Sequence, residues 1–271
     1  VTVLRSAAAE ISSSDDLSRR IPVTGNDDLA ALTTTVNGML ARLESAFGSQ
    51  RQLLDDVGHE LRTPLTVVRG HLELMDPSDP ADAAETRSLA LDEVDRMNLL
   101  VEDLMTLAKA RRPDFVRPVP VAVALLTDEV LAKAEPLGER RWVLDSLADV
   151  QVEADPQRLT QAWLQLVSNA VKFSADGSTV GIGSRYSPTT GTVRLWVRDE
   201  GPGIEPADQA RIFERFERLD PGVEGTGLGL SIVALIAEAH NGQVDLESTA
   251  GAGSTFSMVL PVSPGTDSGQ T

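Results

Sequence analysis

The chain has 271 residues and contains no cysteine, so it can form neither a disulfide framework nor a thiolate metal site. It also has no apolar run as long as a membrane-spanning helix, and no signal peptide opens it. We therefore expect this chain itself to be soluble. It begins at Val1 without an initiator methionine and in the middle of a sequence pattern, which suggests that an upstream part exists.

Basic residues are few: 24 lysines and arginines stand against 41 acidic residues, and the net charge is -17. A surface of this kind repels phosphate backbones, so DNA and RNA are excluded as expected partners. The length allows two domains with a sizeable core. Helical patterns dominate the first half of the chain, and strand-like runs alternate with helices in the second half.

The stretch HELRTPLT, residues 59–66, lies within a long helical pattern. His59 falls off the apolar stripe of that pattern and has Glu60 beside it and Thr63 four residues later. Pro64 has no N–H to donate, so we expect it to bend the helix at this turn. An exposed histidine next to a carboxylate is typical of a nucleophile. The alternative for the octapeptide alone is a surface histidine on an ordinary coiled coil.

Helical periodicity extends on both sides of this stretch. Residues 1–46 predict a helix, an extended connector and a second helix that runs on towards His59 without a break signal. Pro77 and Pro80 predict a stop and a turn, after which a second amphipathic helix ends near Pro113. This helical hairpin has too little core alone, so two copies should pair as a four-helix bundle.

From Val119 onwards strands alternate with helices. Asp155 and Pro156 form a good helix start, and the helix that follows carries Asn169 and Lys172 on one side. An amide oxygen suits magnesium, and a lysine suits phosphate. The three tryptophans are expected in the core. The sequence GTGLGLSIV, residues 225–233, alternates glycines before an apolar helix, so backbone N–H groups can face phosphate. It is neither a P-loop nor a GxGxxG fingerprint.

In this order, HELRTPLT, the Asn169 motif, DEGPGI (199–204), IFERFER (212–218) and the glycine loop resemble the boxes of sensor histidine kinases of two-component systems. The resemblance implies a multidomain protein: an all-α dimeric helical bundle followed by an α/β sandwich ATP-binding domain of the GHKL type. The domains it implies are a HAMP-like linker (1–46), a dimerisation and phosphotransfer hairpin (47–112), a hinge (113–118), an ATP-binding catalytic domain (119–263) and a disordered tail (264–271).

The resemblance also implies roles for residues. His59 would be phosphorylated, Glu60 would orient its ring or accept its proton, and Thr63 would position water for dephosphorylation of the partner. Asn169 would bind Mg²⁺. The residues implied to bind ATP are Gln165, Asn169, Lys172, Phe173, Asp199, Gly201, Gly203, Ile204, Phe213, Arg215, Phe216, Arg218, Gly225, Thr226, Gly227, Leu228, Gly229 and Leu230.

Two departures from the family pattern stand out. Gln165 occupies a position where the family commonly has a second asparagine, and the segment between Arg218 and Gly225 is short and less basic than usual. Both leave the affinity for nucleotide open. They also support an alternative function, a dimeric signalling scaffold or phosphatase that binds ATP weakly. A gyrase-type ATPase is a third possibility, but it does not explain HELRTPLT.

The family implies three kinds of partner: a second copy of the chain, the receiver domain of a response regulator, and a membrane reached through the upstream segment. We accordingly expect this chain to be the cytoplasmic portion of a membrane protein. The stimulus, the cognate regulator and the choice between phosphorylation within or across subunits do not follow from the sequence.

Overall fold

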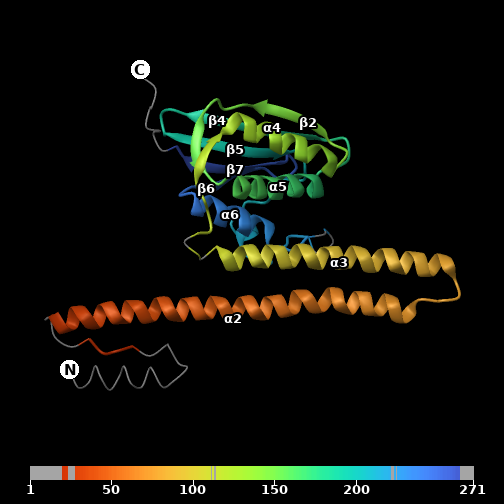
Figure 1. Ribbon diagram of the computed structural model, residues 1–271, viewed down its shortest axis with the longest axis horizontal. Coiled ribbons are helices and arrows are strands. Elements are labelled where there is room, and N and C mark those ends of the chain that lie inside the picture. The colour runs from red at the N-terminus through yellow and green to blue at the C-terminus, as the bar shows by residue number, and fades with distance from the viewer. Residues whose placement is uncertain are drawn as a thin grey trace. The chain divides into compact units, whose positions relative to one another are not determined.

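The computed structural model describes residues 20–23, 28–110, 112, 114–220, 223 and 225–262 (Figure 1). The predicted first helix, part of the connector and the tail at 264–271 lie outside these residues. The chain divides into two compact units, Val1–Thr86 and Arg87–Thr271. None of the helices in the described ranges combines the length and hydropathy that a membrane span requires.

The first unit is dominated by one helix, α2, which runs from Asp28 to Leu74 over 47 residues and contains Pro64. The prediction of a helix that continues from the connector through His59 is therefore confirmed. The predicted stop is also confirmed, because α3 (Pro80–Lys109) begins at Pro80. Asp79 caps this helix, its Oδ1 accepting the Ala81 N–H at 2.9 Å.

The described part of the connector is fastened to α2 by a side chain. Asn37 accepts the backbone N–H of Ile21 at 2.9 Å and donates to its carbonyl oxygen at 2.8 Å. Ile21 itself is only 3% exposed. Because both backbone groups of one connector residue bond to one amide, this residue holds a fixed position along α2.

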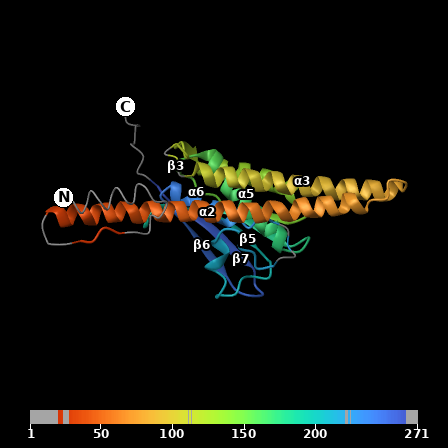
Figure 2. The same cartoon turned by 90° about the horizontal axis from the view of Figure 1, so that it is seen from below.

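The second unit is built around a five-stranded sheet in the order β2-β4-β5-β7-β6. Strands β2 and β4 are parallel and the other neighbours are antiparallel; Figure 2 shows β6 beside β7. A separate two-stranded sheet joins β1 and β3. The strands are β1 (Val119–Ala122), β2 (Arg141–Ser146), β3 (Gln151–Ala154), β4 (Thr179–Ser187), β5 (Thr192–Asp199), β6 (Gln243–Ser248) and β7 (Ser254–Pro261).

Three helices cover one face of the sheet, α4 (Val123–Ala134), α5 (Pro156–Phe173) and α6 (Gly229–Ala239). Alternate residues of β5 explain this arrangement, since Val193, Leu195 and Val197 are buried towards the helices. The α/β sandwich predicted from the sequence is confirmed. The described part of the unit also contains two short 3₁₀ turns, η1 (Glu135–Leu137) and η2 (Arg211–Phe213).

The prediction that all tryptophans belong to the core holds for Trp163, which is 0% exposed. It is wrong for Trp196, which is partly exposed on the sheet face opposite the helices. Its indole lies over Gly183, where an added Cβ would come within 2.3 Å of the ring, and its Nε1 donates to Asp145 at 3.1 Å. The missing side chain of Gly183 makes room for this ring.

Candidate functional site

Helix α5 brings the residues of the Asn169 motif together. Its start is fixed by Asp155, whose Oδ1 accepts the N–H groups of Gln157 and Arg158 at 3.0 and 3.1 Å. Its apolar face is buried against the sheet, which leaves Gln165, Asn169 and Lys172 on the opposite side, one turn apart. Sequence spacing and burial thus place all three along one wall of a cavity.

Arg140 fixes the other end of α5. Its side chain is 6% exposed, and its Nη2 donates to the carbonyl oxygens of Val171 and Ser174 at 2.8 Å each. These are carbonyls that the helix itself leaves without partners. The guanidinium also opposes the negative end of the helix dipole. Lys172 and Phe173 therefore stand on a helix end that a buried cation holds in place.

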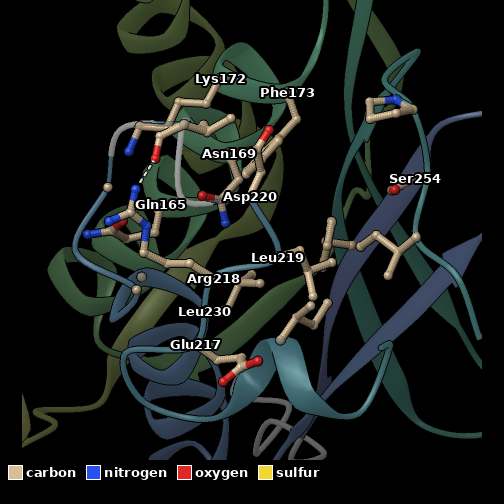
Figure 3. A pocket seen from close by; sticks show the side chains of 18 of the residues that line it. Gln165, Asn169, Lys172, Phe173, Glu217, Arg218, Leu219, Asp220, Leu230 and Ser254 are labelled. Carbon is tan, nitrogen blue, oxygen red and sulfur yellow. Dashed lines mark hydrogen bonds between the residues drawn. The ribbon is translucent and has the colours of Figure 1, made fainter. Parts of the chain in front are cut away.

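The cavity has a volume of 270 Å³ and lies entirely within the second unit (Figure 3). Its wall comes from α5, the turn after β5, the segment after η2, the glycine loop with the start of α6, and β7. The lining residues that the sequence predicted are Gln165, Asn169, Lys172, Phe173, Gly203, Ile204, Arg218, Gly225, Thr226, Gly227, Gly229 and Leu230.

Six predicted residues do not line the cavity: Asp199, Gly201, Phe213, Arg215, Phe216 and Leu228. Two of them support the wall from behind. Phe213 packs edge-on against Phe256, a lining residue, with ring centroids 6.4 Å apart. Leu228 is fully buried just before α6. Arg215 is exposed and is not brought to the wall.

Asp199 lies at the end of β5 and is 7% exposed. Its Oδ1 accepts the N–H of Gly201 at 2.8 Å, which shapes the turn that carries Gly203 and Ile204 into the cavity wall. Burial raises the pKa of Asp199, against the opposing effect of hydrogen bonds from the backbone N–H groups of Gly201 and Ser254. This carboxyl group is thus held near the cavity by backbone donors from the turn after β5 and from the start of β7.

The glycine loop is closed by a contact with the segment after η2. The carbonyl oxygen of Gly227 accepts the N–H of Phe216 at 2.9 Å. Gly227 has φ +69°, and an added Cβ would lie 2.7 Å from the backbone of Phe216. Only glycine allows both the backbone conformation and the close approach. The two predicted motifs therefore form one structure around the mouth of the cavity.

The cavity holds charges of both signs. Lys172 and Arg218 line it, and so do Glu217 and Asp220. Glu217 also pairs with Arg211 of η2. The basic side chains come from α5 and from the segment after η2, where Arg218 stands just before the short segment noted in the sequence.

The donor set of the wall suits a hard cation shared with phosphate. Asn169 and Gln165 offer amide oxygens on successive turns of α5, and Mg²⁺ prefers oxygen ligands while keeping waters and phosphate oxygens. Across the described part of the chain, no group of three histidine, cysteine, aspartate or glutamate side chains is arranged to hold a metal alone. Asn169 and Gln165 are the residues of the wall that would hold such a cation together with phosphate.

His59, Glu60 and Thr63 lie in the first unit, on α2. His59 and Thr63 are exposed, and Thr63 Oγ1 donates to the His59 carbonyl oxygen at 3.4 Å. Pro64 has no N–H for the Glu60 carbonyl oxygen one turn back, so the backbone around His59 is held by one helical hydrogen bond fewer. The histidine therefore offers an accessible ring on a locally weakened turn.

Sequence reasoning missed several lining residues, and those on β7 lie outside every motif named above. Ser254 and Phe256 reach the site only because β7 pairs with β5, which sets Ser254 opposite Asp199 and Phe256 opposite Val197. An alternating pattern after the turn at 251–253 is the signal that points to this strand. The missed lining residues are Pro202, Ile212, Glu217, Leu219, Asp220, Val223, Ser254 and Phe256.

His240 follows the last residue of α6, a position at which the helix dipole favours a cation. It is 8% exposed, its Nε2 accepts the N–H of Asp155 at 3.0 Å, and its Nδ1 lies 2.7 Å from the Ile236 carbonyl oxygen. A ring nitrogen that accepts carries no proton, so this is the neutral tautomer with its hydrogen on Nδ1. It links α6 to the start of α5.

Comparison with known families agrees with the order of the motifs. Residues 154–264 match the family model of the histidine kinase-, DNA gyrase B- and HSP90-like ATPases. Residues 49–113 match the His Kinase A phospho-acceptor domain, and residues 1–45 match the HAMP domain. The matches follow one another along the chain, with residues 46–48 and 114–153 between them.

The chain is 37% identical over 280 residues to the signal transduction histidine-protein kinase/phosphatase MprB of Mycolicibacterium vanbaalenii, covering 96% of this chain and 56% of that protein. It spans about half the length of the curated relatives it matches. Two solved structures share the fold. Acinetobacter baumannii histidine kinase AdeS has a TM-score of 0.60 at 28% identity, covering 75% of this chain and 98% of that one.

The second solved structure is that of ShkA in complex with AMPPNP. Its TM-score is 0.57 at 31% identity, and the match covers 79% of this chain and 46% of that one. The family models, the MprB relative and these structures agree with the order of the motifs found in the sequence. The chain belongs to the sensor histidine kinases of two-component systems.

Proposed function

We propose that the chain is an ATP-dependent protein histidine kinase that phosphorylates its own His59 and then passes the phosphoryl group to an aspartate of a response regulator. The observation that carries the proposal is the cavity, because its wall draws on separate sequence motifs that each match one box of the family. Packing alone gives no reason for these motifs to converge.

Nucleotide fits the cavity in one direction. The glycine loop and the first turn of α6 offer backbone N–H groups, and Lys172 and Arg218 add positive charge, so the phosphates belong at this end. Ile204 and Phe256 line the wall near Asp199, and they suit the flat base. Asp199 has lone pairs beyond its backbone bonds, and we propose that one accepts the amino hydrogen of adenine.

Magnesium belongs beside Asn169, with Gln165 as a second amide oxygen on the same face of α5. When bound, the metal neutralises charge on the phosphates. The protein's own contribution is to hold these two amides and the phosphate-binding loop in fixed relative positions. Glutamine in place of the family's asparagine extends one amide by a methylene group, so its oxygen reaches further from the helix.

At His59 the chemistry is an in-line displacement. A ring nitrogen donates its lone pair to the γ-phosphorus, and the bond from that phosphorus to the bridging oxygen breaks and releases ADP. Only the neutral imidazole form has a free nitrogen lone pair to supply. The ring then loses its other N–H proton, which we assign to Glu60 or to water. His59 and Glu60 both precede Pro64 on the weakened turn of α2.

We assign the opposite activity, dephosphorylation of the regulator, to a different residue. Thr63 lies one turn after His59 on the same helix face, exposed to solvent, and we propose that it positions the water that removes phosphate from the regulator. The MprB relative is named a kinase/phosphatase, in line with both activities on one helix. The proposed partners are a second copy of the chain, a response regulator receiver domain, and a membrane reached through an upstream segment.

Incubation of the chain with γ-labelled ATP and magnesium tests this function. We expect label that survives alkali and is lost in acid, as a phosphoramidate requires. His59→Gln should abolish the label, and His71→Gln should keep it. His71 is a matched control, since it is a second histidine on α2 outside the predicted motif.

Other outcomes point to the rival functions. Label that persists in His59→Gln contradicts the assignment of the phosphoacceptor. Nucleotide binding with no label on the native chain favours the scaffold or phosphatase. ATP turnover that is equal in the native chain and in His59→Gln favours a gyrase-type ATPase.

A further inference from the structure

Asp103, on α3, contacts two residues of the cavity wall although it does not line the cavity itself. Its Oδ2 accepts the hydroxyl hydrogen of Thr226 at 2.9 Å, and its Oδ1 accepts Nε2 of Gln165 at 3.2 Å. Asp103 is 7% exposed and belongs to the same compact unit as the cavity. No motif in the sequence pointed to this residue.

Burying this carboxyl group is costly, and the surroundings compensate for only part of the cost. Burial raises the pKa of Asp103, while the hydrogen bond from Thr226 and the positive charge of Lys172 oppose the rise. The carboxylate of Asp103 therefore lies at a position where three groups can bind an anion: one hydroxyl, one amide and one ammonium group. All three of these groups come from the wall of the proposed nucleotide site.

Thr226 has a single hydroxyl hydrogen, and it is given to Asp103. The hydroxyl oxygen also accepts the N–H of Leu228 at 3.2 Å, so its bonding capacity is largely used. A phosphate oxygen at the glycine loop needs the same hydrogen. Gln165 is oriented in the same way: because a carboxylate only accepts, Nε2 faces Asp103, which leaves Oε1 close to Gly229 at the start of α6.

We propose that Asp103 fills, from α3, part of the anion-binding set that the nucleotide phosphates use, so that α3 and the phosphate chain compete for Thr226 and Lys172. This inference rests on the nucleotide site proposed above. It makes Asp103 a latch: nucleotide binding loosens the hold of α3 on the catalytic fold, and release of α3 strengthens nucleotide binding by the same factor. In a kinase, ATP binding would then release from α3 the domain that must carry ATP to the phosphoacceptor histidine.

The competition is specific to Asp103 because a second contact of α3 avoids the cavity. Thr106, one turn further on and 6% exposed, accepts Nε2 of Gln161 at 3.1 Å. Gln161 does not line the cavity. Among the described residues, side-chain hydrogen bonds hold α3 to α5 at Asp103 and at Thr106, and those of Asp103 are the ones that oppose phosphate.

The test compares ADP with adenosine, which lacks phosphate, by calorimetry on the full chain with magnesium. Asp103→Asn removes the charge and turns an amide N–H₂ towards one of the two donors. We expect it to tighten ADP binding about tenfold, a usual size for coupling between sites, and to leave adenosine binding unchanged. Glu102→Gln is the matched control, because it removes one charge from the adjacent, exposed position of α3 and should change neither.

ADP binding that is unchanged or weaker in Asp103→Asn overturns the latch, and so does an equal change for ADP and adenosine. The proposed function fails separately, and the latch with it, if the native chain binds neither ligand.

A second measurement leaves Asp103 in place. The chain has no cysteine, so spin labels can be set at Asp95→Cys on α3 and Thr189→Cys in the exposed turn between β4 and β5, diluted with unlabelled chain. ADP should change the distance distribution and adenosine should not. A distribution that ADP leaves unaltered contradicts the release of α3.

Discussion

Alanine at position 203 should destabilise the second unit far more than alanine at position 177. Both glycines have similar positive φ angles, +69° at Gly203 and +75° at Gly177. Their surroundings differ. A Cβ at position 203 would lie 2.0 Å from the carbonyl oxygen of Thr249, whereas nothing lies within 4 Å of a Cβ at position 177.

The magnitudes follow from these contacts. The left-handed backbone costs alanine about 1 to 2 kcal/mol at either position. At Gly203 the turn must also move away from Thr249, which strains the bonds from Gly251 N–H to the Pro202 carbonyl oxygen and from Ile204 N–H to Ser248 Oγ. Each is worth about 1 kcal/mol, and overpacking adds about 1 to 3 kcal/mol. Gly203→Ala should therefore cost about 3 kcal/mol more than Gly177→Ala.

Urea unfolding followed by tryptophan fluorescence measures this difference, because all three tryptophans lie in the second unit. Helix α2 does not contribute to that signal. Equal losses of unfolding free energy in the two variants would refute the steric argument and leave only the cost of the left-handed backbone conformation. Gly203→Ala should also weaken ADP binding, since the displaced turn forms part of the cavity wall.

Three further predictions use the same unfolding assay. His240→Phe leaves the buried N–H of Asp155 without an acceptor and should lower the free energy of unfolding by about 2 kcal/mol; a loss below experimental error contradicts the neutral-tautomer contact. Arg140→Met keeps the apolar stem but removes the donors to the end of α5, and should cost about 3 kcal/mol and weaken ADP binding. Burial raises the pKa of Asp103 above 3.8, so the folded state binds more protons there and the contribution of Asp103 to stability falls as pH rises from 3.8 through the raised pKa. The unfolding free energy of Asp103→Asn minus that of the native chain should therefore increase with pH over this window, and a flat difference contradicts the shift.

The sequence predicted those parts of the fold that local pattern determines. Asp155 and Pro156 predict the start of α5, and the proline pair predicts the break between α2 and α3, because capping and the missing N–H of proline act over a few residues. The alternating residues of β5 similarly predict a strand with one buried face.

What the sequence could not predict depends on pairing between distant segments. Phe256 reaches the cavity through the register between β5 and β7, and Asp103 reaches Thr226 through a contact across 123 positions. Neither leaves a local signature. His240 illustrates the same limit, since a histidine after a helix looks like a charged cap until the partner of its second nitrogen is known.

The uninterrupted course of α2 restricts how the length of this protein can change. Over 47 residues the helix extends about 70 Å, and it contains no loop to absorb an added residue. One residue inserted between Asn37 and His59 turns the histidine by about 100° about the helix axis relative to the connector, whereas seven residues bring it back to within about 20°. Insertions and deletions in this stretch should therefore be tolerated best when they come close to whole helical turns, as seven or eleven residues do, so the rotation of His59 about the axis of α2 limits changes in length.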